Sequence, residues 1–550
     1  MDFAGFSIFI IPEFMEMTCT MAFDPVVVKF KDRVPKKRGR GRLWLFTAIA
    51  VMFAAAAGTW GFSAFSHRSA NFGPQFEVIS NGTGKIIRVP SGGDLQAAID
   101  GANAGDIIEL QAGATYFGEI MLPNKPLTDF VTVRSSAFAN LPEGKRVTPA
   151  QTSSLAKILS RTAGKPALSA ADGANHYRFI GIEFSSSITK YNYALISFGS
   201  GEKSASRVPH DLEIDRCYIH PLKDGIVRRG IALNSASTTI QNSYIEGFAF
   251  PGEETQGIAG WTGTRDVHII NNYIEGGAEN ILIGGNDPAA PDLSPTNIEI
   301  RRNHINKPAE WVGKATLKTL FELKNAKHVQ LTDNLLTNNW VGSAFRLTVR
   351  NQDGTAPYST IEDVLIQGNV IDGGGEGINI LGKDNLQASG TLKGLMIKNN
   401  LLMNIGPGHG FDGSGYFLQI NDGEDITVVN NTSFNAGNIV TFYGEMPRRF
   451  VFRDNITGHG NYGIHGLDVR SPESLAMFPR NVFINLNRVT RDGWAFPRGN
   501  AIVPGSEDVG FVNLQGHDYR LSPASRYRGK ALGGKDLGCT LSMKDLEPYR

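Results

Sequence analysis

The stretch Asn271-Asn272-Tyr273-Ile274-Glu275-Gly276-Gly277 contains the pattern on which most of the chain is built. Two asparagines end one segment of alternating apolar residues, and another apolar segment begins directly after them. This phrase returns along most of the 550 residues, at intervals of 24 to 35. The residues at the position of Asn272 are Ser243, Asn272, Asn303, Asn334, Asn369, Asn400, Asn431 and Asn455. The chain is therefore a repeat protein.

The period of the repeat and the short segments inside it indicate the fold. Self-similarity at a period of about 20–50 residues is typical of solenoids and propellers. Segments such as Val329-Gln330-Leu331 and Ile426-Thr427-Val428 alternate apolar and polar residues, as short strands with one buried face do. The asparagine after each tolerates the left-handed conformation of a sharp turn, and stacked coils would let each asparagine amide bond to the next. We predict an all-β fold, a single-stranded right-handed parallel β-helix.

Length and charge restrict the number of domains and the class of partner. A solenoid lengthens by adding coils, so we expect one long domain, residues 85–540, in a monomeric protein. The formal net charge is +1, but residues 29–42 contribute +7, which leaves −6 for the rest of the chain. A mildly acidic body argues against a nucleic-acid partner, which needs a basic field. No Cys or His pattern has the spacing of a zinc site.

A basic tail and an apolar segment precede the repeats. Residues 43–65 are 23 positions without a charge, enough to cross about 30 Å of hydrocarbon as a helix, and the basic run before them would stay in the cytoplasm. The alternative is a cleaved signal peptide with an Ala55-Ala56-Ala57 cleavage site. We predict a cytoplasmic tail 1–42, a transmembrane signal-anchor or signal peptide 43–65 and a linker 66–84. The body would be exported to the periplasm or cell surface, anchored to the inner membrane.

A short amphipathic helix is predicted before the first coil. Asp94-Leu95-Gln96-Ala97-Ala98-Ile99 places two large apolar residues four positions apart, as a cap over the open end of a solenoid requires. This phrase and the following Ala104–Gly113 resemble the entry segment of exported bacterial β-helix proteins of the pectate-lyase-like superfamily, and Tyr519–Pro523 with Gly534–Gly538 are similar to their closing segment. The resemblance covers residues 85–540 and implies the same fold. That superfamily includes lyases, hydrolases, esterases and non-catalytic binders.

The second long strand of each coil alternates apolar residues with polar residues that must face outward. Strands of adjacent coils lie about 4.8 Å apart, so equivalent polar residues form a ladder along the outside. The predicted members are Lys324, then Arg346 or Arg350, then Asn379 and Gln419, with Glu322 and Lys383 beside them. Such a cationic, amide-rich strip suits an acidic polysaccharide, whose carboxylates would be met by arginine and lysine.

The same strip contains candidates for β-elimination from a uronic acid. That reaction needs a cation for the carboxylate, a base for the C5 proton and an acid for the leaving oxygen. We predict Lys324 as the base, with Arg350, Arg346 or Tyr443 as the acid. The predicted substrate-binding residues are Glu322, Asn379, Lys383, Gln419 and Tyr443.

The block from Lys324 through Asn334 to Arg346 resembles the Lys–strand–Asn–strand–Arg arrangement of chondroitinase B and the alginate lyases of its family. The resemblance implies a lyase in which Lys324 and Arg346 are base and acid. Those enzymes place two glutamates shortly before the lysine to hold calcium, whereas Leu317–Phe321 contains none and only Glu322 is near. No metal site is predicted, and a requirement for calcium is left open.

Two other functions fit the same residues. A non-catalytic surface protein that binds glycans would expose aromatic residues, for which Trp261, Trp311, Trp340 and Tyr443 are the candidates. An inverting glycoside hydrolase would need two carboxyl groups about 6.5–9.5 Å apart, and the candidate pairs are Glu322 with Glu279 or Glu376. Lys324 and Glu322 can also be read as a solvated ion pair, and the residues after Arg350 as an Asp-Gly turn.

Overall fold

The computed structural model describes residues 77–80, 84–460, 462–468, 471–484 and 497–543. Residues 71–550 belong to one compact unit. The predicted tail 1–42, the predicted membrane or signal segment 43–65 and most of the predicted linker lie outside the described residues, so export and anchoring stay predictions. Within the described ranges, no helix is long and apolar enough to cross a membrane.

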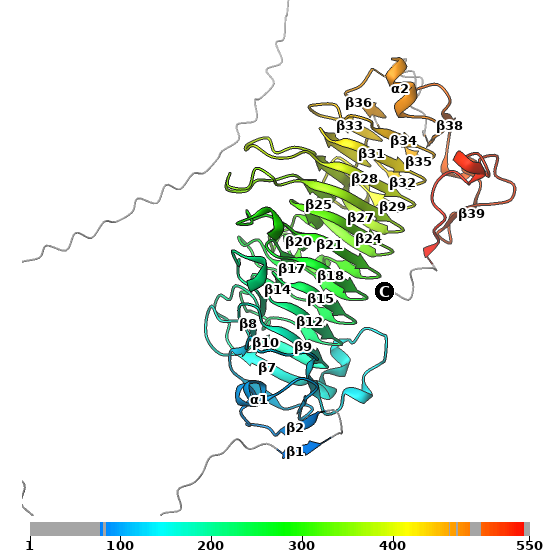
Figure 1. The fold of residues 1–550 in the computed structure, drawn as a ribbon. Coiled ribbons are helices and arrows are strands. Elements are labelled where there is room, and N and C mark those ends of the chain that lie inside the picture. The colour runs from blue at the N-terminus through cyan, green and yellow to red at the C-terminus, as the bar shows by residue number, and fades with distance from the viewer. Residues whose placement is uncertain (1–76, 81–83, 461, 469–470, 485–496, 544–550) are drawn as a thin grey trace, which may run out of the picture. The chain divides into compact units, whose positions relative to one another are not determined.

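The body is a stack of coils, each of which contributes up to three strands (Figure 1). One strand of each coil belongs to a sheet that has 14 strands in the described part of the chain, here called the first row. Its strands are β1 (Glu77–Ser80), β2 (Lys85–Val89), β3 (Ile107–Leu110), β6 (Val131–Ser135), β9 (Asn175–Ile180), β12 (His210–Asp215), β15 (Ala236–Gln241), β18 (Arg265–Ile270), β21 (Thr296–Arg301), β24 (Ala326–Thr332), β26 (Ile361–Gln367), β28 (Lys393–Lys398), β31 (Glu424–Val429) and β34 (Val451–Arg453).

The other two strands of each coil belong to a second sheet, which the long strands β25 (Leu335–Thr348) and β27 (Val370–Leu381) join across both of its rows. Its second row, directly after the asparagine turn, also contains β4 (Thr115–Phe117), β7 (Ala156–Ser160), β10 (Ile182–Ser186), β13 (Tyr218–Ile219), β16 (Tyr244–Ile245), β19 (Tyr273–Glu275), β22 (His304–Asn306), β29 (Leu401–Ile405), β32 (Thr432–Asn435), β35 (Ile456–Gly458), β37 (Val482–Ile484) and β38 (Ala501–Val503). The third row also contains β5 (Ile120–Leu122), β8 (Leu168–Ala170), β11 (Ile196–Phe198), β14 (Arg229–Leu233), β17 (Gln256–Gly260), β20 (Glu279–Ile283), β23 (Thr319–Leu323), β30 (Leu418–Asn421), β33 (Val440–Phe442) and β36 (Ile464–His465).

Strand pairing confirms the predicted parallel β-helix. Among the described strands, all pairs are parallel except β1 with β2 and β39 (Phe511–Asn513) with β40 (Asp518–Leu521). The inward residues of the first row stack in register from coil to coil and are fully buried; one such column is Ile240, Ile269, Ile300, Leu331, Ile366, Ile397 and Val428. Burial of branched apolar side chains on every coil supplies the main favourable free energy of the fold.

The asparagine ladder is also confirmed, and it continues to Asn481 and Asn500, beyond the predicted set. From Asn303 onward, the Oδ1 atom of each ladder asparagine accepts hydrogen bonds from the backbone N–H and the Nδ2 of the asparagine one coil earlier, at 2.7–3.2 Å. The residue before the ladder position adopts the left-handed conformation, with φ of 54° at Asn271 and 71° at Gly368. One residue therefore makes the sharp turn, and the next residue supplies the buried side-chain amide.

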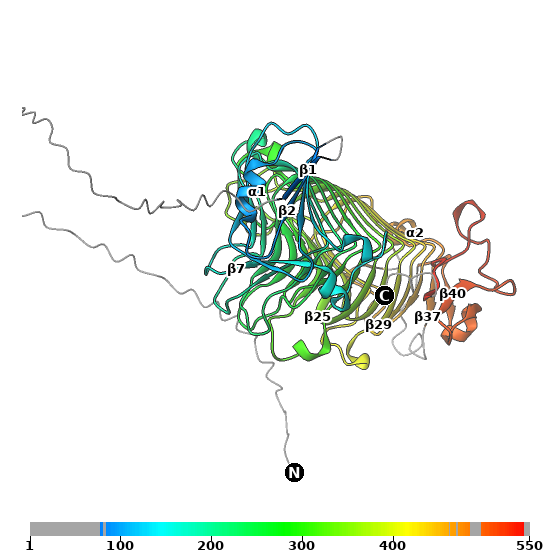
Figure 2. The same cartoon turned by 90° about the horizontal axis from the view of Figure 1, so that it is seen from below.

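The N-terminal end of the stack is covered as predicted, with one correction (Figure 2). Helix α1 (Leu95–Gly101) buries Leu95, Ala98 and Ile99, and the Asp94 side chain caps it by accepting from the N–H of Ala97 at 3.0 Å. The linker prediction is wrong for residues 77–80, which form β1 and pair antiparallel with β2. Sequence alternation in Glu77-Val78-Ile79-Ser80 is too short to indicate a strand without its partner.

The remaining helices are short and lie in the connections between strands. They are α2 (Pro472–Met477) and the 3-10 helices η1 (Phe138–Asn140), η2 (Pro149–Ser154), η3 (Ala205–Arg207), η4 (Pro291–Leu293), η5 (Ala309–Trp311), η6 (Pro407–His409), η7 (Ser506–Val509) and η8 (Leu532–Gly534). The connection between β6 and β7 contains η1 and η2, and it packs Leu141, Val147 and Leu155 against Tyr218 on the outside of the second row.

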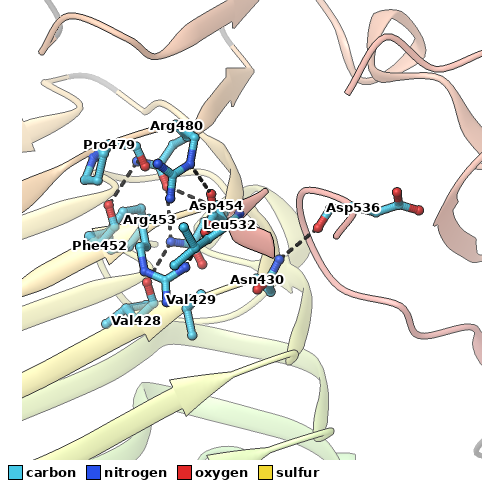
Figure 3. Close-up of polar contacts among 12 residues, drawn as sticks. Val428, Val429, Asn430, Phe452, Arg453, Asp454, Pro479, Arg480, Leu532 and Asp536 are labelled. Carbon is cyan, nitrogen blue, oxygen red and sulfur yellow. Dashed lines mark hydrogen bonds and ion pairs between the residues drawn. The ribbon is translucent and has the colours of Figure 1, made fainter. Parts of the chain in front are cut away.

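The predicted end of the β-helix at residue 540 is corrected by the structure. The last strand of the stack is β38, and the residues after it form the β39–β40 hairpin and fold back along earlier coils. In Figure 3, Asn430 donates to the backbone oxygen of Asp536 at 2.9 Å, and the buried Asp454 carboxylate lies between Arg453 and Arg480. The N–H of Gly538 also bonds to the carbonyl of Asp454 at 2.9 Å. This C-terminal segment is therefore anchored at Asn430 and Asp454.

Candidate functional site

The predicted outward ladder exists on the third row. Strand register places Glu322 beside Arg346, Arg346 beside Asn379, and Asn379 beside Gln419. Lys324 follows the end of β23, two residues after Glu322. The ladder begins at Glu322, because the equivalent position one coil earlier is the apolar Leu282.

Amide and phenol groups form one hydrogen-bonded chain at the C-terminal half of the ladder. Asn379 Nδ2 donates to Gln419 Oε1 at 2.8 Å and to the Tyr416 hydroxyl at 3.4 Å. Tyr443 lies one strand further, and its hydroxyl donates to the carbonyl of Ile380 at 3.2 Å and to Asn379 Oδ1 at 3.5 Å. Since Tyr443 is 39% exposed, its hydroxyl is accessible to a ligand that lies on the ladder.

Arg346 is the unsatisfied member of the ladder. Among the residues that the structure describes, its guanidinium makes no hydrogen bond or ion pair, and its Nε is buried without an acceptor. A buried guanidinium donor without a partner is unfavourable. The side chain can therefore donate hydrogen bonds to an anionic group.

Glu322 is buried near both positively and negatively charged side chains. Burial raises its pKa to about 7, and the nearby Glu279 adds to the rise, while Lys324, Arg346 and Lys318 oppose it. The Nζ of Lys324 is 3.9 Å from Glu322 Oε1, longer than a good charge-assisted hydrogen bond. The interpretation of these two residues as a solvated pair is wrong for Glu322, which is only 6% exposed.

The pH dependence of stability tests this environment of Glu322. Its folded-state pKa lies above the ordinary value of 4.5, so the stabilisation from the bound proton is complete below about pH 4.5 and is lost as pH rises through about 7. Between about pH 4 and pH 8, we expect the wild type to lose roughly 2–3 kcal/mol of unfolding free energy relative to Glu322→Gln, which does not titrate. Thermal melts of both proteins across this range measure the difference. Parallel curves would show that Glu322 titrates normally.

Glu279 and Glu376, the candidate partners of Glu322, have different surroundings. Glu279 is buried, accepts from Gln256 Nε2 at 2.7 Å and lies 4.0 Å from the Nζ of Lys318. Glu376 accepts from Ser343 Oγ at 2.9 Å and from the N–H of Ser414 at 3.1 Å. The charge of Glu279 adds to the rise in the pKa of Glu322 that burial causes, so Glu279 is the better candidate partner of the two.

Two predicted site residues, Arg350 and Lys383, are placed differently from the ladder. Arg350 Nη1 donates to Asp384 Oδ1 at 2.7 Å, and the fully buried Asp384 side chain also accepts from the N–H of Asn351 at 2.8 Å. Lys383 is exposed and begins the same loop. The Arg350–Asp384 ion pair thus holds the loop after β27, and this arrangement favours Arg346 over Arg350 as the arginine available to a ligand.

Two loops that connect the third row to the first row are joined by hydrogen bonds beside the ladder. The carboxylate of Asp287, in the loop between β20 and β21, accepts from the N–H groups of Gln352, Asp353 and Thr355 in the loop between β25 and β26, at 2.6–3.0 Å. These two loops therefore form one connected edge. Asp287 was not recognised in the sequence because its partners lie 65 to 68 residues away.

Of the three candidate tryptophans, Trp261 is buried, and Trp311 and Trp340 are partly exposed. Trp340 stacks on Phe411 with ring centroids 4.9 Å apart and donates from Nε1 to the carbonyl of Lys307 at 2.8 Å. Trp261 is 8% exposed. Trp311 lies in η5 and is partly exposed. The aromatic residue of the predicted site that remains open is Tyr443.

Concave surfaces lie away from the ladder. One of them, of about 780 Å³, is on the first row and is lined by residues that include His268, Glu299, His328 and Asp363. Its histidines face carboxylates, with His268 Nδ1 2.8 Å from Glu299 and His328 Nδ1 3.2 Å from Asp363. Since these polar groups already have partners, we place the candidate site on the third row, where Arg346 has none.

Metal-ligating side chains do not gather in the described part of the chain. No group of three or more His, Cys, Asp or Glu residues that could hold a metal ion is found there. Sequence reasoning missed Tyr416, whose hydroxyl lies 2.8 Å from Ser343 Oγ and also contacts Asn379; Tyr416 precedes β30, so strand alternation gave no signal for it.

Comparison with known proteins gives matches in structure only. No family model matches the chain, and no curated protein matches its sequence. A mannuronic acid specific polysaccharide family 6 lyase from human gut microbiota is 15% identical over 74% of this chain and 88% of its own, with a TM-score of 0.45. Pectate lyase Pel9A is 13% identical over 82% and 95%, with a TM-score of 0.37. The catalytic domain of a GH87 alpha-1,3-glucanase is 13% identical over 72% and 64%, with a TM-score of 0.34.

Proposed function

We propose that this protein binds an acidic polysaccharide along the third-row ladder and cleaves it by β-elimination. The observation that carries the proposal is Arg346, whose guanidinium has no partner among the described residues and whose Nε is buried. A carboxylate matches the planar donor fork of arginine. The amides of Asn379 and Gln419 continue the same ladder and can bond to sugar hydroxyls on the next units.

Each reacting group of the elimination has a candidate on the ladder. Lys324 and Arg346 come from neighbouring strands, and the Tyr443 hydroxyl reaches back to Asn379, beside Arg346. Arg346 would neutralise the uronate carboxylate, which acidifies the C5 proton. Lys324, in its uncharged form, would take that proton as general base while the C4–O bond breaks and the C4–C5 double bond forms. The Tyr443 hydroxyl would donate a proton to the leaving oxygen. Glu322 lies 3.9 Å from the Lys324 ammonium and would hold it in place between turnovers.

Product analysis tests the proposal. The full-length chain is incubated with polymannuronate, polygalacturonate, chondroitin sulfate and a neutral glucan, with and without calcium. We expect ultraviolet absorbance from an unsaturated uronate with at least one acidic polymer and none with the glucan. Retarded migration in a gel that contains an acidic polymer, without any product, would instead establish a non-catalytic glycan-binding protein.

The environment of Glu322 favours hydrolysis as a second candidate. Its pKa is raised to about 7, which would keep it protonated as a general acid near neutral pH, and Glu279 would serve as the base of an inverting hydrolase. The two reactions give different products, because hydrolysis yields new reducing ends without unsaturation. Measurement of both signals in the same digest separates them.

A further inference from the structure

A second cluster with an unsatisfied guanidinium lies on earlier coils of the third row. Arg229, on β14, lies between two aromatic rings, with its Cζ 4.5 Å from the ring centroid of Tyr193 and 4.9 Å from that of Trp261. The two rings are nearly perpendicular, with centroids 6.3 Å apart. We call Tyr193, Arg229 and Trp261 the aromatic–arginine cluster.

The guanidinium of Arg229 is buried without a hydrogen-bond acceptor. The residue is 6% exposed, and its Nε and Nη1 have no partner within the described residues. Contact with the two rings offsets part of the cost of burying the charge, but the N–H donors remain unsatisfied, which is unfavourable. An anionic ligand at this position would satisfy them.

Tyr193 is the exposed member of the aromatic–arginine cluster. Tyr193 is 40% exposed and covers one face of the guanidinium, so a turn of its ring gives access. The outward residues Ala232 and Ala259 are in register with one another and are buried beside Trp261. The open side of the cluster is therefore that of Tyr193.

The cluster lies on the same row as the ladder that contains Arg346. Trp261, Gly284 and Lys324 each directly follow a third-row strand, β17, β20 and β23 respectively, and these three strands are neighbours. Gly284 and Gly285 both have φ of 88° and leave no side chain between Trp261 and Lys324. From β14 to β25 there are four strand steps, or roughly 19 Å at the usual spacing.

We propose that the aromatic–arginine cluster is a second subsite for the same acidic polysaccharide. The Tyr193 ring takes a sugar face, and Arg229 takes the carboxylate of a uronate several units away from the one at Arg346. This inference rests on the proposed function, since it requires a polymer that runs along the third row. Long chains occupy both the ladder and the cluster, and trisaccharides occupy only one of them.

Tyr193→Ala and the matched control Tyr191→Ala test the subsite. Both tyrosines are 40% exposed, but only Tyr193 stacks on Arg229. In the full-length chain, we expect Tyr193→Ala to weaken affinity for polymannuronate or polygalacturonate about tenfold, equivalent to about 1.4 kcal/mol, in affinity gels. Affinity for the corresponding trisaccharide should remain within about twofold by calorimetry, and Tyr191→Ala should match the wild type in both assays. Arg229→Gln should weaken polymer binding at least as much.

The outcomes separate the subsite from the function. Equal polymer affinity of Tyr193→Ala and Tyr191→Ala, with the wild type binding, would overturn the subsite and leave the proposed function intact. Binding of polymer without any elimination product, still weakened by Tyr193→Ala, would support the subsite and overturn the lyase reaction. Failure of the wild type to bind either polymer would overturn both. Melting temperatures of the variants identify any loss of folding.

Discussion

Replacement of Lys324 with alanine is expected to lower kcat for elimination by roughly 10²–10⁴-fold, the usual contribution of a general base, with little change in KM. Lys324 directly follows β23. This strand pairs with β25, which contains Arg346. Arg346 would hold the carboxylate next to the carbon that loses its proton. Initial rates of product absorbance across substrate concentrations measure both constants.

Lys324→Arg and Lys327→Ala serve as controls for this result. Lys324→Arg keeps the positive charge but does not deprotonate near neutral pH, so it should be as inactive as the alanine variant if Lys324 is the base. Lys327 lies on the first row and pairs with Glu362 at 3.2 Å, and Lys327→Ala should retain full activity. An active Lys324→Arg variant would show that this position supplies only a charge.

Replacement of Asn334 with alanine is expected to destabilise the body by roughly 3–5 kcal/mol, because several buried polar groups lose their partners. Its Oδ1 accepts from the N–H and Nδ2 of Asn303 at 2.9 and 3.0 Å. Its Nδ2 donates to the carbonyl of Ile300 and to Asn369 Oδ1, both at 2.9 Å. The side chain is fully buried, so water cannot replace these bonds.

Thermal and urea unfolding of Asn334→Ala beside Gln330→Ala measure this loss. Gln330 lies on the same coil, on the outward face of β24, and is exposed; its replacement should change unfolding free energy by less than about 0.5 kcal/mol. Equal melting temperatures for the two variants would mean that the asparagine ladder sets the register of the coils without stabilising them.

The features that sequence predicted are those that repeat. Short alternating strands and an asparagine every 24 to 35 residues are local signals that occur many times over. The coils and the asparagine ladder were therefore recognisable, as was helix α1 from its own apolar spacing. The order of Arg346, Asn379 and Gln419 followed, because register is fixed once inward residues are assigned.

The features that sequence did not predict depend on single contacts between distant segments. Asp384 holds Arg350 in an ion pair that no periodic pattern indicates. The burial that raises the pKa of Glu322 arises from neighbours on several coils. The N–H of Thr540 bonds to the side chain of Asn399, 141 residues earlier, so the return of the C-terminal segment had no local signal.

The antiparallel strand β1 also limits how copies of this protein can join. A parallel stack could in principle be extended by the last coil of a second molecule, and repeated head-to-tail joining of this kind yields filaments. β1 covers the edge of β2 in the opposite chain direction and is only four residues long, so a further parallel strand finds neither the direction nor the length that it needs. At the other edge of the first row, α2 packs against β34. Both ends of the first row are therefore closed by elements unlike its coils.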